Sequence, residues 1–310
     1  MYRVLDDYLD IDVCSSPQIK KEETMKEVYI GVDIGKSGGV GIIIDNGKKS
    51  CRRAIRYVPD HNILRDTIES ITDGVNGYPQ VYCLIEKVHS QGCRFMQLTY
   101  NNQSLLATGC YEKNDSGVTN FGKEAIKEMN RVGIVVDMSH SAEKSTLDAI
   151  EISQKPIAIT HANPTFWFEA KRNKSTELLK VLSDSGGMLG LSLYAHHLKD
   201  GTNCKIESFC EMVARTVEIM GIDNVGIGSD LCLNQPDSVV EWMRNGTWSK
   251  SKNFGEGSKD KPGFPKQPDW FLDARGFNNI NTELKNKGFH EEEINKILGN
   301  NWFNFYKGIN

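Results

Sequence analysis

Several features typical of membrane, secreted or nucleic-acid-binding proteins are missing from this 310-residue sequence. No apolar run reaches the roughly 20 residues that a helix needs to cross a bilayer. Lysine and arginine number 37 against 41 aspartate and glutamate residues, so no basic excess is available to neutralise a phosphate backbone. The acidic start, MYRVLDDYLDIDV, lacks the basic and apolar regions of a signal peptide. We therefore expect neither a membrane nor a nucleic acid as a partner.

The cysteines are also missing the spacing that would give them a structural role. There are eight, and no two form a C-x-x-C pair. Disulfide frameworks and zinc ribbons rely on closely spaced cysteines, so neither is predicted here. Scattered free thiols are typical of a reduced compartment, and we expect a cytoplasmic protein.

The hydrophobic pattern of the first third of the chain changes at Met25. Residues 1–24 have no periodicity, and we expect a poorly ordered leader. Beyond them, short apolar runs alternate with turns. This pattern predicts an α/β segment with strands at 28–34, 40–45, 50–58 and 80–86 and an amphipathic helix at 61–71.

From residue 92 onward, strand and helix patterns alternate strictly. Strands are predicted at 94–100, 133–140, 156–161, 188–194 and 224–230, and helices at 121–131, 142–153, 175–183 and 206–220, with Asn120 and Ser141 placed as caps for the first two. Such alternation is typical of a parallel sheet with right-handed crossovers. Polar residues end strand after strand, which favours a partial (β/α)₈ barrel. Five strands leave an open edge, so residues 25–90 or a second copy in a homo-oligomer must cover it.

Two of these strands end on histidine, at His140 and His161, and another ends on Asp230. Imidazole nitrogens and carboxylate oxygens are the ligands that Zn²⁺ takes in catalytic sites. A histidine after an apolar run is more often a packed core residue. Two on consecutive strands, with an aspartate in GSD, bring the metal interpretation level with that alternative.

Two acidic residues in the first segment suggest a different metal site. Asp33 stands in the first predicted strand, and Glu86 ends a later one. Paired carboxylates on neighbouring strands hold Mg²⁺ in two-metal nucleases. Ordinary acidic residues at strand ends are the simpler explanation of the pattern.

Residues 25–90, with VDIGKSGGVGIII and CLIEKVHS, resemble the first part of a phage-type Holliday-junction resolvase of the RNase-H-like fold. The resemblance implies that Asp33 and Glu86 are catalytic. That family completes its site with a further acidic pair on a C-terminal helix, and no such segment follows here. The nuclease site is therefore expected to be incomplete.

Residues 92–310 resemble the C-terminal two-thirds of the membrane (renal-type) dipeptidases, zinc peptidases on a TIM-barrel scaffold. The matching phrases are FMQLTYNNQ, FGKEAIKEMNRVGIVVDMSH, PIAITHANP, KRNKS, GGMLGLSLY, VGIGSD and KILGNNWFNFY. They occur in family order at family spacing. We therefore predict a metallo-dependent hydrolase fold, strands four to eight of the barrel, preceded by an RNase-H-like fragment at residues 25–91.

The dipeptidase resemblance implies a role for each matched residue. His140 and His161 bind the second zinc, and Asp230 shuttles a proton. Arg172 holds the free carboxylate of a dipeptide or small peptide-like substrate, a role suited to a forked guanidinium. Tyr100 stands where many relatives carry a substrate-binding histidine.

The sequence departs from the dipeptidase pattern in its metal ligands. The His-x-Asp pair that holds the first zinc is absent throughout the chain. Glu86 ends a strand, as the bridging glutamate should, but too few residues separate it from residue 94 for a parallel crossover. Three hypotheses follow: an impaired zinc-dependent dipeptidase with at most one zinc, a magnesium-dependent Holliday-junction nuclease fragment, and an inactive fusion of two truncated domains.

Overall fold

A computed structural model describes residues 92–232 and 264–309 with their side chains, together with Ile85, His89, Pro236 and Ser238. Of residues 27–83 it describes only the backbone of four strands. The chain divides into two compact units, Met1–Gln91 and Gly92–Asn310. The predicted leader, the helix at 61–71 and Glu86 lie outside the described residues.

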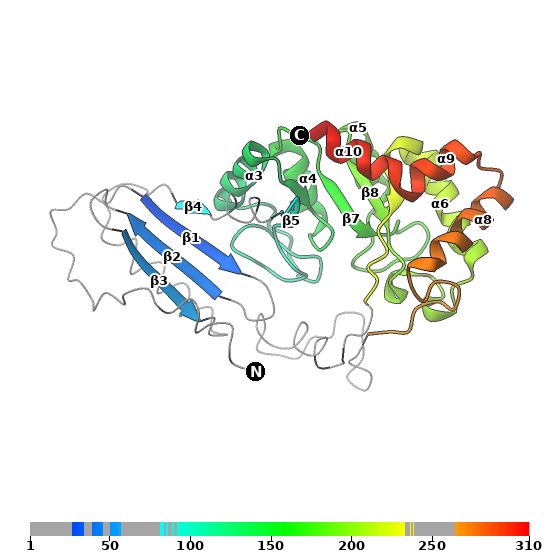
Figure 1. The fold of residues 1–310 in the computed structure, drawn as a ribbon, viewed down its shortest axis with the longest axis horizontal. Helices are drawn as coiled ribbons and strands as arrows, with labels where there is room; N and C mark the ends of the chain where they lie inside the picture. The colour runs from blue at the N-terminus through cyan, green and yellow to red at the C-terminus, as the bar shows by residue number, and fades with distance from the viewer. Residues whose placement is uncertain are drawn as a thin grey trace. The chain divides into compact units, whose positions relative to one another are not determined.

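The first unit contains a mixed four-stranded sheet in the order β3-β2-β1-β4 (blue to cyan in Figure 1). Its strands are β1 (Glu27–Asp33), β2 (Gly39–Asp45), β3 (Ser50–Arg56) and β4 (Val81–Cys83). β2 runs antiparallel to β1 and β3, whereas β4 is parallel to β1. Asp33 is the last residue of β1. The resemblance of this segment to a resolvase stays a prediction.

The second unit is built on a five-stranded sheet in chain order, with every pair of neighbours parallel. Its strands are β5 (Phe95–Gln97), β6 (Val135–Asp137), β7 (Ala158–Ala162), β8 (Met188–Leu191) and β9 (Val225–Ile227). The predicted parallel α/β architecture is confirmed. The buried strands are rich in valine, isoleucine and leucine, as expected for a sheet covered by helices.

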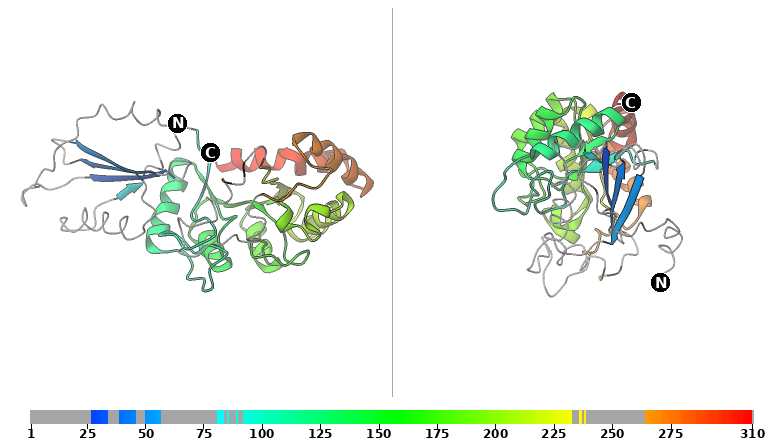
Figure 2. Two further views of the ribbon diagram at one scale, coloured as in Figure 1. Left: turned by 90° about the horizontal axis from the view of Figure 1, so that it is seen from below. Right: turned by 90° about the vertical axis from the view of Figure 1, so that its left-hand side faces the viewer.

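Helices fill the connections between these strands. They are α3 (Asn120–Val132), α4 (Glu143–Ile152), α5 (Thr176–Asp184) and α6 (Ile206–Met220), with short helices η2 (Ala195–His197), η3 (Gly201–Asn203) and η4 (Ile222–Asn224). The C-terminal part holds η5 (Ala274–Gly276), α8 (Phe277–Asn286), α9 (Glu291–Asn295), η6 (Lys296–Asn300) and α10 (Asn301–Ile309). The turned views show these helices gathered around the sheet (Figure 2).

Both predicted helix caps were wrong. The N-cap of α3 is Thr119 rather than Asn120, because the extended backbone at Thr119 lets its hydroxyl accept from Gly122 N. The N-cap position of α4 is Ala142, which has no capping side chain. Asp115, from a distant loop, instead accepts the backbone N–H groups of Lys144 and Ser145. Sequence-local capping rules miss such a cap because its donor and acceptor are about thirty residues apart.

The last helix, α10, packs aromatic side chains on the sheet. Trp302 and Tyr306 contact Phe95 of β5, and Trp302 Nε1 donates to Ile227 O of β9 at 3.0 Å. Asn301 Nδ2 donates to two carbonyls, Ile222 O and Val225 O. The end of the chain is thereby fixed to both edges of the parallel sheet. No helix in the part of the chain that the structure describes is long and apolar enough to cross a membrane.

Candidate metal centre

The polar residues predicted at the strand ends lie just beyond the strands, at a regular distance. Each lies three residues after the end of its strand: Tyr100 after β5, His140 after β6 and Asp230 after β9. The predicted strand at 133–140 was too long, because Ser141 N donates to Met138 O and turns the chain there. His161 differs, since β7 continues through it to Ala162.

The two histidines meet. Nε2 of His140 lies 3.0 Å from Nε2 of His161, with the rings edge to face at 67°. His140 is buried, and His161 is partly exposed. Two ligands at about 2.05 Å from a tetrahedral zinc lie about 3.3 Å apart. The spacing of the two nitrogens therefore fits one shared cation.

Asn101 determines which nitrogen of His140 carries the proton. Its side-chain oxygen accepts from His140 Nδ1 at 2.7 Å, so Nδ1 is protonated and Nε2 keeps its lone pair. Tyr100 stacks on the same imidazole, with 4.0 Å between ring centroids. The ring is thus held both in orientation and in tautomer.

A chain of three groups does the same for His161. Asp137 Oδ2 accepts the hydroxyl proton of Thr160 at 2.7 Å, so Thr160 Oγ1 is left as an acceptor. His161 Nδ1 lies 2.8 Å from that oxygen and donates to it. Its Nε2 therefore carries the lone pair. Histidines that bind metals are usually oriented by such a partner on the other nitrogen.

These hydrogen bonds aim two lone pairs at one point. Neither Nε2 has a hydrogen to offer the other, so the 3.0 Å approach is repulsive unless a cation lies between them. The donor set therefore fits zinc, with His140 and His161 as its ligands. Among the described residues no group of three or more histidine, cysteine or acidic side chains is placed to hold an ion.

Arg172 lies against the pair. Its loop, residues 164–174, returns to its starting point because Pro164 pairs with Lys174. The guanidinium is buried, and Nη1 lies 2.8 Å from Nδ1 and 3.2 Å from Nε2 of His140. Nε donates to Ser139 O and Nη2 to His161 O. Arg172 thus contacts the ring of His140 and the backbone carbonyl of His161.

Two residues of the site have strained backbones. Asn101 and Asp230 have φ of 62° and 52°, and they are the only non-glycine residues with positive φ in the described part of the chain. Such strain persists where surrounding structure enforces it, and it clusters at functional sites. Burial lowers the pKa of His161, and the negative charge of Asp230 opposes that shift. Asp230 is therefore close enough to influence the His140–His161 pair.

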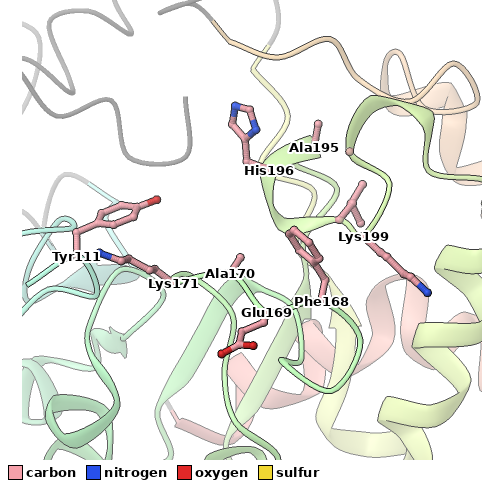
Figure 3. A pocket seen from close by; sticks show the side chains of 10 residues that line it. Tyr111, Phe168, Glu169, Ala170, Lys171, Ala195, His196 and Lys199 are labelled. Atoms are coloured by element: carbon pink, nitrogen blue, oxygen red, sulfur yellow. The ribbon is translucent and has the colours of Figure 1, made fainter. Parts of the chain in front are cut away.

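A pocket of about 500 Å³ opens between the loops that follow β7 and β8. Figure 3 shows Tyr111 and Phe168 on opposite sides of it. Lys171, the neighbour of Arg172, lines the pocket and lies 5.6 Å from the centre of the Tyr111 ring. His196 and Lys199 also line it. A small polar molecule could therefore be accommodated next to the loop that carries Arg172.

The sequence pattern singled out the two histidines but not the residues that orient them. Asn101, Asp137 and Thr160 were not singled out, although an aspartate inside the apolar run GIVVDMSH is a usable signal. Tyr100 and Arg172 lie against His140. Of the alternative nuclease pair, only the backbone of Asp33 is described, and Glu86 is outside the described residues.

Acid is expected to destabilise the folded protein through this histidine pair. Burial, and then the charges of Arg172 and His161, lowers the pKa of His140 well below 6.5, and burial also lowers that of His161. Below about pH 6.5 these histidines bind protons in the unfolded chain but not in the folded protein. The free energy of unfolding therefore decreases as the pH is lowered, by up to about 1.4 kcal/mol per pH unit for each histidine. Urea unfolding at pH 7.5, 6.5 and 5.5 measures this slope. A His140→Asn, His161→Asn double variant should have a shallower slope, and an unchanged slope would contradict the assignment.

Comparison with known protein families gives a match over residues 70–241, to a model described as membrane dipeptidase (peptidase family M19). Two curated dipeptidases are similar to part of this chain. An uncharacterized dipeptidase of Schizosaccharomyces pombe is 29% identical over 170 residues, which are 52% of this chain and 41% of the relative. Dipeptidase 3 of Mus musculus is 22% identical over 258 residues, 76% of this chain and 46% of the relative. The chain thus spans less than half the length of these relatives.

Solved structures are similar in fold. An amidohydrolase from Pseudomonas aeruginosa has a TM-score of 0.67 at 29% identity, covering 81% of this chain and 78% of the other. A metallopeptidase from Rhodobacter sphaeroides, liganded with a phosphinate mimic of the dipeptide L-Ala-D-Ala, has a TM-score of 0.58 at 21% identity, covering 72% and 57%. The family match begins at residue 70, before the predicted boundary near residue 91, and so includes Glu86.

Proposed function

The chain belongs to the membrane dipeptidase family, peptidase family M19, and from that premise we propose that it is a zinc-dependent hydrolase of dipeptides with a single-ion site. One observation carries the proposal: the Nε2 lone pairs of His140 and His161 converge at 3.0 Å, each fixed by a hydrogen bond on the opposite nitrogen. The five parallel strands then correspond to part of a (β/α)₈ barrel.

The proposed roles of the other residues follow from their positions. Zinc, when held by His140 and His161, makes hydroxide available near neutral pH. Asp230 takes up a proton and delivers it to the leaving amine. Arg172 binds the free carboxylate of the substrate through its forked N–H groups. The pocket beside Lys171 receives the side chain next to that carboxylate.

Tyr100 has a supporting role in this scheme. Its ring stacks on His140, which holds the imidazole plane in place. A phenol in this position can also donate a hydrogen bond to the substrate carbonyl. We therefore assign it to orienting the ligand and the substrate rather than to proton transfer.

Zinc binding tests the ion site directly. Two nitrogen ligands give weaker binding than a complete site, so we expect about one zinc per chain, removable by dialysis against a chelator. The His161→Asn variant should bind none, whereas His290→Asn, at an exposed helix cap, should bind as the parent does. Elemental analysis after equilibrium dialysis gives the stoichiometry. Two tightly bound ions would contradict the single-ion site.

Substrate hydrolysis tests the reaction. We expect cleavage of L-Ala-L-Ala or L-Ala-D-Ala when zinc is added, and loss of cleavage in His161→Asn. The amine released from each dipeptide can be followed with a ninhydrin-type reagent. Cleavage of a four-way DNA junction with magnesium, and of no dipeptide with zinc, would instead support a nuclease built on Asp33 and Glu86.

A further inference from the structure

The pocket between the loops after β7 and β8 has an excess of positive charge along its walls. Lys171, Lys199 and His196 border it, and among the described residues that line it Glu169 is the one acid. Figure 3 shows the carboxylate of Glu169 turned away from Tyr111 and His196. Within the described part of the chain, the space between those two rings therefore has basic but no acidic side chains beside it.

Lys171 and Tyr111 form one wall of this space. The ammonium of Lys171 lies 5.6 Å from the centre of the Tyr111 ring, and the phenol oxygen points into the pocket (Figure 3). An ammonium has three donors and a phenol has one, so the two groups can donate to both oxygens of a carboxylate. Lys199 differs, because its ammonium lies over the ring of Trp167, 6.0 Å from the centre.

This wall is joined to the ion site. Tyr111 N donates to Asn101 O at 2.9 Å, and Asn101 Oδ1 accepts from Nδ1 of His140. Lys171 directly precedes Arg172, whose guanidinium lies against the ring of His140. Both parts of the wall are thus one residue, or one backbone hydrogen bond, from a residue that contacts His140.

The loop that carries Lys171 is itself rich in positive charge. Between residues 164 and 174 it holds Lys171, Arg172 and Lys174 but only one acid, Glu169. Arg172 and Lys174 are buried, and in the described ranges neither forms an ion pair with a carboxylate. Burial lowers the pKa of Lys174 to about 8, so this side chain is still mostly charged near pH 7. Opposite charges attract, so this loop favours an anionic group in the pocket beside it.

We propose that Lys171 and Tyr111 bind an acidic side chain on the C-terminal residue of the substrate, and that dipeptides ending in glutamate or aspartate are therefore preferred. The inference rests on the proposed function and names the substrate class of that site. The side-chain carboxylate accepts hydrogen bonds from the Lys171 ammonium and the Tyr111 hydroxyl. Because Lys171 is exposed, water weakens the attraction, and the preference over a neutral side chain of the same shape is about fivefold.

A matched pair of dipeptides tests this preference through hydrolysis. L-Ala-Glu and L-Ala-Gln, each with either configuration of the second residue, differ in charge and have nearly the same shape. With zinc added, we expect kcat/KM of the parent to be about fivefold higher for L-Ala-Glu. Lys171→Met should bring the ratio to about one, and Lys171→Glu should invert it. Lys180→Met removes an exposed lysine of α5 and should keep the parental ratio.

Salt and the phenol separate charge from shape. In about 1 M sodium chloride the screening length falls to about 3 Å, so the ratio should fall toward one. Tyr111→Phe keeps the ring beside Lys171 and removes one donor, so the ratio should lie between those of the parent and Lys171→Met. A fivefold ratio that neither salt nor Lys171→Met changes would overturn the assignment.

Binding without catalysis is the second arm. Calorimetry compares N-acetylglutamate with N-acetylglutamine, using both enantiomers of each, on the parent and on Lys171→Met. We expect N-acetylglutamate to bind the parent about fivefold more tightly than N-acetylglutamine, and the two to bind Lys171→Met equally. Circular dichroism establishes that each variant is folded.

The two arms distinguish this inference from the proposed function. Equal cleavage of both dipeptides, with equal binding of both N-acetyl compounds, would overturn the inference and leave the dipeptidase activity standing. Binding of N-acetylglutamate that depends on Lys171, without cleavage of any dipeptide, would overturn the proposed function and support the pocket's preference for acidic groups. Neither binding nor cleavage would overturn both.

Discussion

Alanine at Gly228 is expected to prevent the second unit from folding stably. A Cβ at this position would lie 1.7 Å from Thr160 O, a backbone atom that cannot rotate away, and 3.1 Å from the Cα of Gly190. Overpacking of this kind typically costs about 1–3 kcal/mol and occasionally more. Because Thr160 orients His161, any backbone shift that relieves the contact also displaces His161 relative to His140. Chemical denaturation and zinc titration measure the two consequences.

A second glycine serves as the control for Gly228. A Cβ added at Gly308, in α10, meets no atom within 4 Å. Since alanine is the better helix former, Gly308→Ala should be stabilising by about 0.5–1 kcal/mol. Equal stability of the two variants would show that strands β8 and β9 do not pack as closely on Thr160 as described.

The second large effect is expected from Asp137→Asn. The carboxylate accepts hydrogen bonds from Ser139 N, from Thr160 N and from the hydroxyl of Thr160. An amide NH₂ in place of Oδ2 would donate to that hydroxyl and free its proton for Nδ1 of His161. The ring proton then resides on Nε2, where it blocks the ion, and zinc affinity should fall by about 10- to 100-fold.

This prediction has a control and a clear contrary result. Asp184→Asn changes an exposed acid at the end of α5 and should leave zinc affinity unaltered. Calorimetry reports zinc affinity, and thermal melting shows whether each variant is folded. An Asp137→Asn protein that binds zinc as tightly as its parent would show that Thr160 does not determine the tautomer of His161.

The strand order of the second unit was predictable because it depends on a strong, local pattern. The apolar runs that form β5 to β8 are each followed by a helix with one apolar face, and a parallel sheet is the arrangement that buries those faces. The places where polar side chains gather follow from that topology. His140 and His161 were found in this way, because parallel strands end at a common edge.

What the sequence could not supply was the contact between distant segments. Asn101 reaches His140 across 39 positions, and Asp137 reaches Thr160 across 23. Both pairings depend on side-chain geometry that no local propensity encodes. The missed cap of α4 has the same cause, since Asp115 caps that helix from 29 residues or more away. Strand ends were overestimated because an apolar run continues through the turn at Met138, which is buried without being in a strand.

The tautomers of His140 and His161 are the central claim, and ¹⁵N NMR of the imidazole nitrogens measures them most directly. Long-range ¹H–¹⁵N correlation spectra near pH 7.5, with assignment by the His140→Asn and His161→Asn variants, distinguish a protonated from an unprotonated ring nitrogen. We predict Nδ1–H and a bare Nε2 in both rings, with both Nε2 resonances shifting when zinc is added. A proton on Nε2 of either ring, unmoved by zinc, would contradict the account.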